Sequence, residues 1–146
     1  MQIPGHLAVA VAESHLPLFR RGPRRLLILL FVASLFPDGV DKTIGYVFHA
    51  MPNGRHFAHN LFSMVGLSLL AGLIFGPAGG WAWFCGYLGH LLADSGRMVP
   101  WFFPLKKYPF KKGRLKFEPI QLLGETVILL LVLILGRKRD FFHKKD

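Results

Sequence analysis

Gly86-Tyr-Leu-Gly-His90-Leu-Leu-Ala-Asp94-Ser95 is an apolar stretch that carries one histidine and one aspartate four residues apart. We expect it to be helical, and on a helix positions i and i+4 lie on one face, one turn apart. Ionisable groups inside an apolar segment are costly, so they are usually paired or functional. His90 and Asp94 could therefore bind one divalent cation, or form a structural pair that ties this helix to its neighbours.

The composition around this stretch indicates a membrane protein. The chain has 146 residues, is 52% hydrophobic and carries a formal net charge of +10. Residues 61–89 contain no charged side chain, and the cations gather at 20–25, 106–116 and 137–145. Apolar blocks bounded by basic blocks are typical of integral membrane proteins, whereas a soluble nucleic-acid binder spreads its cations over a solvated face. We expect a multi-pass protein of the cell membrane, without a nucleic-acid partner.

Proline, glycine and charge divide the chain into about five short helices. The expected helices cover about residues 6–19, 26–36, 57–75, 81–95 and 120–135. Pro37-Asp38-Gly39 is expected to end the second helix, and the segment 76–80 to turn the chain between the third and the fourth. A basic aromatic loop (100–119) and a charged tail (137–146) complete one helical membrane domain over 1–146. The expected fold is an all-α, up-and-down bundle integral to the membrane.

In such a bundle the polar ends of four helices fall on the same side. Those ends carry His6, Asp38, Asp41, His59, His90 and Asp94. Imidazoles and carboxylates that converge in this way match the ligands of zinc, manganese and iron, and zinc is the cofactor we expect. Counting the helical rise from the 76–80 turn places His59 level with Asp94 and His90 about a turn deeper. Each residue also has a structural interpretation, since Asp38 and Asp41 could stop or cap helices and His59 could cap one.

Four segments carry a family resemblance, and they occur in the family's order over about residues 5–104. They are Gly5-His6, Phe36-Pro-Asp-Gly-Val-Asp-Lys42, Pro52-Asn-Gly-Arg-His-Phe-Ala-His-Asn60 and the opening stretch itself. The chain resembles the YdjM-like family of membrane-bound metal-dependent hydrolases, which is distantly similar to zinc-dependent phospholipase C. The resemblance implies a helical protein of a prokaryotic inner membrane, with metal ligands at the six His and Asp positions named above. Many members have a histidine where this chain has Gly54, and His56 could supply a ligand in its place.

We interpret the chain as a metal-dependent hydrolase of phosphoesters such as lipid or lipid-linked head groups. Asp38, Asp41 or Asp94 would help to deprotonate a water molecule, and Arg55 would stabilise the developing negative charge. Lys42 and Arg97 are further candidates for that role. The alternative is a non-catalytic membrane protein that uses the His/Asp cluster to bind metal or a partner.

Two further features of the sequence lie outside the His/Asp cluster. The basic stretch from Lys106 to Lys116 is interleaved with aromatic residues and is expected to lie on anionic lipid head groups. Glu125 lies inside the last expected helix and has no evident partner in the sequence.

Overall fold

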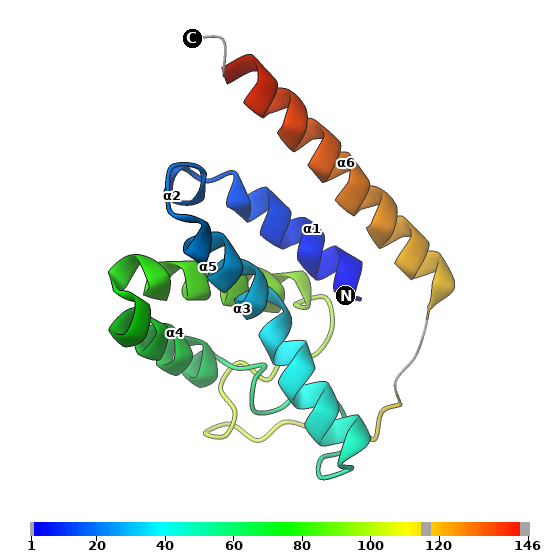
Figure 1. Cartoon of the computed structure of the whole chain (residues 1–146). Coiled ribbons are helices and arrows are strands. Elements are labelled where there is room, and N and C mark those ends of the chain that lie inside the picture. The colour runs from blue at the N-terminus through cyan, green and yellow to red at the C-terminus, as the bar shows by residue number, and fades with distance from the viewer. Residues whose placement is uncertain (1, 115–117, 144–146) are drawn as a thin grey trace.

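The computed structural model describes residues 2–114 and 118–143, and within them all regular secondary structure is helical (Figure 1). In chain order the elements are α1 (Ile3–Ser14), α2 (Pro17–Arg20), α3 (Arg24–Lys42), the π-helix η1 (Thr43–Val47), α4 (Leu61–Phe75), α5 (Pro77–Ala93) and α6 (Pro119–His143). The all-α prediction is confirmed for the described residues.

The turn between α4 and α5 is a tight hairpin, as predicted. Gly76 has a φ of 80°, a conformation that glycine adopts without steric cost. Gly80 lies so close to α4 that an added Cβ would be 3.0 Å from the Cα of Gly72. The start predicted for α5, at residue 81, is wrong. The helix begins at Pro77, because proline is well tolerated in the first helical turn, where its missing N–H costs nothing.

α3 continues through Pro37, so the prediction that this helix ends at residue 36 is wrong. Proline inside a helix removes one backbone hydrogen bond. The continued helix makes contacts that offset this loss, since Lys42 Nζ donates to Asp38 Oδ2 at 2.5 Å one turn earlier and Asp41 accepts hydrogen bonds from the loop before α4. Asp38 and Asp41 are therefore helical residues three positions apart on α3, and neither stops or caps a helix.

Three other predicted boundaries are corrected by the same local rules. The helix expected over 6–19 is split into α1 and α2, because Pro17 disfavours a helical conformation at Leu16, which is extended. Residues 57–60 precede α4, whose N-cap is Asn60, with its side chain accepting from the backbone N–H of Ser63 at 2.9 Å. α6 runs beyond residue 135, so the backbone of 137–143 continues this helix.

α5 lies at the centre of the fold and packs against α1, α3 and α4, while α6 lies along α1 (Figure 1). Two buried apolar clusters hold these helices together, one around Leu30 and Ala82 and the other around Tyr87 and Leu91. Helices that follow one another in the sequence alternate in direction, as predicted. The start of α1, the end of α3, the loop before α4 and the end of α5 therefore meet at one end of the molecule.

Among the described residues, one helix is long and apolar enough to cross a membrane. This candidate span covers Pro119–Gly136 within α6. Most of its side chains are exposed, as are several large apolar residues of α4 such as Leu69 and Leu73. The molecule therefore presents two elongated apolar surfaces to its surroundings.

Candidate metal centre

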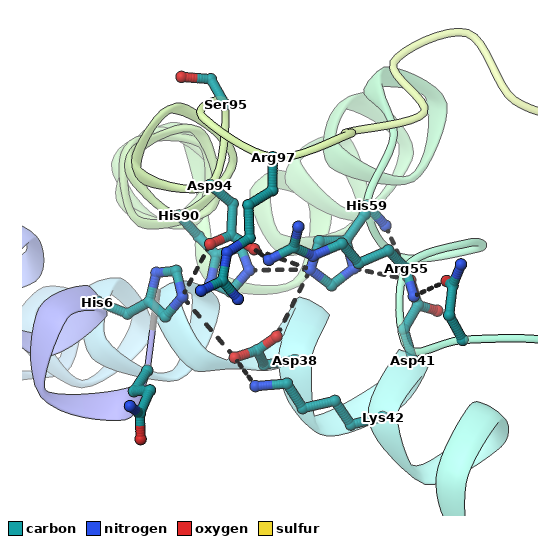
Figure 2. Close-up of polar contacts among 12 residues, drawn as sticks. His6, Asp38, Asp41, Lys42, Arg55, His59, His90, Asp94, Ser95 and Arg97 are labelled. Atoms are coloured by element: carbon teal, nitrogen blue, oxygen red, sulfur yellow. Dashed lines mark hydrogen bonds and ion pairs between the residues drawn. The ribbon is translucent and has the colours of Figure 1, made fainter. Parts of the chain in front are cut away.

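Five of the six predicted ligands meet at the polar end of the bundle (Figure 2). His6 comes from α1, Asp38 from α3, and His90 and Asp94 from the end of α5. Each of these four offers one donor atom, and the four atoms all lie within 4.8 Å of one another. His59, from the loop before α4, adds its Nε2 atom 3.2 Å from Nε2 of His90. All five side chains are buried.

His90 is held by a backbone contact on the far side of its ring. Its Nδ1–H donates to the carbonyl oxygen of Ser34 at 2.7 Å, which leaves the Nε2 lone pair facing His59. The prediction that His90 lies a turn deeper than His59 is wrong. His59 is not part of a helix, so its depth cannot be counted along the helical rise.

Asp41 lies behind His59 and does not face the centre of the cluster (Figure 2). Its Oδ2 accepts from Nδ1 of His59 at 2.8 Å, and its carboxylate also accepts the backbone N–H groups of His56, Ala58 and His59. Burial raises the pKa of Asp41, but these hydrogen bonds outweigh it and hold the pKa below its ordinary value. A carboxylate in this position fixes the tautomer and orientation of a histidine, so that its Nε2 lone pair faces the cluster.

The planes of the three imidazole rings show which nitrogens can share an ion. The rings of His59 and His90 are inclined at 65° and their Nε2 atoms are 3.2 Å apart. Two nitrogens on one tetrahedral zinc ion are separated by about 3.3 Å, given zinc–nitrogen bonds of about 2.0–2.1 Å. The rings of His6 and His90 are stacked, with centroids 3.9 Å apart and planes inclined at only 16°. Because each lone pair lies in the plane of its ring, His6 and His90 address different points.

The two aspartates lie between these points. Asp38 has Oδ2 3.7 Å from Nε2 of His6 and Oδ1 3.6 Å from Nε2 of His59. Asp94 has Oδ1 3.7 Å from Nε2 of His6 and Oδ2 3.9 Å from Nε2 of His59. The donor atoms therefore form two sets, one around His6 and one around His59 and His90, and each aspartate gives one oxygen to each set.

The cluster contains buried polar atoms that the described residues leave unsatisfied. Neither ring nitrogen of His6 has a hydrogen-bond partner among them, and neither does Oδ1 of Asp38. Burial lowers the pKa of His6 to about 4 and that of His90 to about 3, so both rings are neutral at pH 7 and keep a lone pair. Unsatisfied buried groups of this kind each cost about 1–3 kcal/mol. A divalent cation would satisfy Nε2 of His6 and Oδ1 of Asp38, and the donor set fits such an ion.

Two cationic side chains of the described residues flank the cluster. Lys42 binds Asp38, and the guanidinium of Arg55 forms an ion pair with Asp94. Gly54 makes room for this arrangement, because a Cβ at this position would lie 2.7 Å from the ring of Tyr46 and 3.0 Å from Cγ of Lys42. Gly54 is thus packed against the stem of Lys42.

His56 lies outside the group of donor atoms. Its ring is fully buried against Phe110, with centroids 4.5 Å apart. Neither of its nitrogens has a hydrogen-bond partner among the described residues. The structure therefore gives no support to the expectation that His56 supplies a ligand in place of a histidine at position 54.

Sequence reasoning missed two residues that position His59. Tyr87 Oη donates to the carbonyl oxygen of Ala58 at 2.5 Å, and Asn60 Nδ2 donates to the carbonyl oxygens of His56 and Phe57. Together with Asp41 they fix the backbone on both sides of His59. The stretch Gly86–Ser95 therefore supports His59 through Tyr87 and also supplies His90 and Asp94.

Glu125 of α6 caps the start of α1. Its carboxylate is 5% exposed and accepts the backbone N–H of Gln2 at 2.9 and 3.0 Å and that of Gly5 at 3.0 Å. Gln121 Nε2 donates to the same carboxylate at 2.6 Å. Because His6 directly follows Gly5, α6 fixes the helical turn that presents His6 to the cluster.

A cationic cavity of about 340 Å³ lies beside the cluster. Lys42 and Arg55 form part of its wall and connect it to Asp38 and Asp94. The basic loop supplies further cations, and the side chains with formal charge on the wall are Lys42, Arg55, Arg97, Lys111, Lys112, Arg114 and Glu118. Arg97 is 3.8 Å from Glu118 and donates to Gln121, so it faces the start of α6.

Comparison with known proteins identifies the family. No curated protein and no solved structure matches the chain. The family model described as YdjM inner membrane protein matches residues 1–143. This match covers nearly the whole chain, including every residue of the cluster, and the protein belongs to the YdjM inner membrane protein family.

Proposed function

We propose that this protein is a metal-dependent hydrolase of phosphoesters, acting on lipid or lipid-linked head groups at the inner membrane. The observation that carries the proposal is the meeting of five buried His and Asp side chains beside a cationic cavity. Nε2 of His6 supports it, because this buried atom has no hydrogen-bond partner among the described residues and two carboxylate oxygens lie 3.7 Å from it. The cations of the cavity favour an anionic substrate.

In this proposal His6, His59 and His90 hold divalent metal through Nε2, and Asp38 and Asp94 hold it through their carboxylates. Zinc is the ion that this mixture of imidazole and carboxylate suits best, with manganese and iron as further candidates. A bound divalent metal supplies a Lewis acid and lowers the pKa of water. Asp41 is a positioning residue that orients His59.

The remaining chemistry falls to side chains already in place. Arg55 and Lys42 lie where the cluster meets the cavity, so they would bind the phosphate oxygens and stabilise negative charge as it develops. Asp38 or Asp94 would accept the proton of the attacking water. The assignment of Asp41 as a proton acceptor has no support from its contacts, because its carboxylate is already engaged by His59 and by three backbone N–H groups.

The membrane setting follows from α6. Glu118 lines the cavity and Pro119 begins the candidate span, so the cavity opens where that helix would enter the bilayer. Lipid phosphates lie at this level, and the basic loop from Lys106 onward would contact them. The exposed apolar face of α4 suggests that this helix is also embedded, as a multi-pass arrangement requires.

The proposal is tested by hydrolysis of bis(4-nitrophenyl) phosphate, a generic phosphodiester, by purified protein in detergent. We expect activity that is lost on chelation, restored by zinc or manganese, and abolished in His90→Ala and Asp94→Ala. His56→Ala is the matched control, since it removes an equally buried imidazole outside the donor group; a folded His56→Ala protein should keep its activity. Bound metal without hydrolysis of any phosphoester would favour the non-catalytic alternative.

A further inference from the structure

The cavity beside the cluster carries more positive charge than one phosphate group requires. Two of its cations, Lys42 and Arg55, are bound to aspartates of the cluster, and Arg97 lies beside Glu118. The other three, Lys111, Lys112 and Arg114, have no acidic side chain within ion-pair distance in the part of the chain that the structure describes. Like charges gathered on one cavity wall repel one another unless an anion lies between them.

The three loop cations are held at a fixed place relative to the cluster. Asn53 Nδ2 donates to the carbonyl oxygen of Lys111 at 3.1 Å, and the N–H of Gly113 donates to that of Pro52 at 2.9 Å. Asn53 Oδ1 also accepts from the backbone N–H of Arg55 at 3.0 Å. One asparagine thus joins the loop to the turn that carries Arg55.

Gly113 makes this junction close-packed. A Cβ at Gly113 would lie 3.2 Å from Cβ of Asn53 and 3.3 Å from the hydroxyl of Tyr46, so the loop backbone rests directly on the turn. The backbone that carries Lys111, Lys112 and Arg114 is therefore held in place where it forms the cavity wall. Lys106 and Lys107, in the same basic stretch, are exposed as these three cations are, but they do not line the cavity.

The size of the cavity allows more than one anionic group. Its 340 Å³ corresponds to the liquid volume of roughly ten water molecules. A phosphate at the inner wall, against Arg55 and Lys42, leaves the loop side of the cavity open. A second phosphate attached to the first would fill that space and meet the three loop cations.

We propose that the cavity binds a diphosphate group borne on a lipid, with one phosphate at the His/Asp cluster and the other held by Lys111, Lys112 and Arg114. The inference rests on the proposed function and adds a substrate class to it. The lipid source follows from Glu118, which lines the cavity one residue before the candidate span begins. Gln2 also lines the cavity, and its Nε2 donates to the carbonyl oxygen of Glu118 at 2.8 Å, so the start of α1 closes the same side.

The test compares the affinity of the purified full-length protein, in detergent, for inorganic pyrophosphate and inorganic phosphate by calorimetry. We expect pyrophosphate to bind about tenfold more tightly or better, because it engages a second group of cations. The double variant Lys111→Gln/Lys112→Gln should lose most of this preference. Lys106→Gln/Lys107→Gln is the matched control, with the same change of charge in the same loop, and should retain it.

Two outcomes would overturn the diphosphate subsite. One is a wild-type protein that binds the two anions with equal affinity. The other is an equal loss of preference in both double variants, which would mean that only the overall charge of the loop matters. Either result, together with metal-dependent hydrolysis of a phosphodiester, contradicts this inference and leaves the proposed function standing. A retained preference without hydrolysis contradicts the proposed function alone.

A second arm tests the lipid source. Farnesyl diphosphate and farnesyl monophosphate, both in detergent micelles, compete against pyrophosphate for the wild-type protein. We expect farnesyl diphosphate to bind more tightly than pyrophosphate and more tightly than the monophosphate. Equal affinity for farnesyl diphosphate and pyrophosphate would contradict a lipid-borne ligand.

Discussion

At the residue scale, the cluster depends on hydrogen bonds that lie behind the rings. His59 and His90 both direct Nδ1 away from the centre, one to the carboxylate of Asp41 and the other to the carbonyl oxygen of Ser34. Burial lowers the pKa of His59, but its contacts with Asp38 and Asp41 outweigh this and raise the pKa above its ordinary value. The sequence predicts which residues form the site. It does not predict the orientation of the His59 and His90 rings, because that depends on Asp41 and Ser34, which are far from them in the sequence.

Asp41→Asn tests the role of a positioning residue. We expect metal affinity to fall by about 10–100-fold, because an amide holds the tautomer of His59 less firmly than a carboxylate does. The measurement is a zinc-binding titration against a competing chelator, with unfolding followed in parallel. Thr43→Ala, which removes a hydroxyl from the turn after Asp41, should leave the affinity unchanged. A normal affinity in a folded Asp41→Asn protein would refute this role.

His6→Ala tests the division of the donor atoms into two sets. His59 and His90 share one point and His6 addresses another, so loss of His6 should remove about half of the bound metal and leave the rest in place. The measurement is metal per chain by elemental analysis after dialysis. If His6→Ala protein binds as much metal as wild type, or none at all, the two-set arrangement is wrong.

At the element scale, α6 both carries the candidate span and fixes the start of α1. The contacts pair Glu125 with Gln2 and Gly5, which are about 120 residues away in the sequence. The sequence does not predict the contacts of Glu125 with Gln2 and Gly5, because in the sequence Glu125 is only an isolated charge in an apolar helix. The structure accounts for it as the cap of the helix that carries His6.

Glu125→Ala should lower the free energy of unfolding by about 1–3 kcal/mol, because the backbone N–H of Gln2 loses its acceptor and that of Gly5 keeps only the carbonyl oxygen of Gln2, at 3.2 Å. It should also weaken metal binding, since the first turn of α1 is no longer held. Glu118→Ala, which removes a half-exposed carboxylate near the start of the same helix, is the control and should change stability by less than about 1 kcal/mol. Thermal unfolding in detergent measures both, and equal effects of the two changes would contradict the capping role.

Close packing of α3 on α5 gives a second prediction at this scale. A Cβ at Gly86 would overlap the carbonyl oxygen of Leu30, which is backbone and cannot move aside cheaply. Gly86→Ala should therefore destabilise the protein by about 1–3 kcal/mol. Gly66→Ala in α4 meets open space and should be neutral or slightly stabilising, because alanine favours a helix more than glycine. Equal unfolding temperatures for the two variants would argue against the close contact.

At the scale of the whole molecule, the sequence predicts the convergence of the cluster because the polar residues alternate with the ends of apolar helices. That alternation needs only the hairpin at Gly76 and the order of the elements. The prediction failed at Pro37, where proline rules indicate a helix end but contacts of Asp38, Asp41 and Lys42 outweigh the lost hydrogen bond. Local propensity cannot account for interactions made with a loop fifteen residues farther along the chain.

The position of His90 relative to His59 is a second case in which local rules gave a wrong prediction. Counting helical rise requires that His59 belong to a helix, and Asn60 instead caps α4 just after it. The basic loop is a third case. Lys111 and Lys112 line the cavity and Lys106 and Lys107 do not, and the sequence gives no sign of this difference, which follows from the contacts of Asn53 and Gly113. The sequence identifies the histidines, aspartates and cations that could take part in the site. Only the fold shows which of them are ligands, which support a ligand and which line the cavity.

The metal content of the purified protein tests the central claim most directly. The full-length chain is loaded with zinc in detergent, dialysed free of unbound metal and analysed by elemental mass spectrometry beside His90→Ala/Asp94→Ala and His56→Ala. The account predicts at least one tightly bound ion per chain in the wild type and in a folded His56→Ala protein, and a loss of most of it in the double variant. Less than one equivalent in the wild type, unchanged by His90→Ala/Asp94→Ala, would contradict the account.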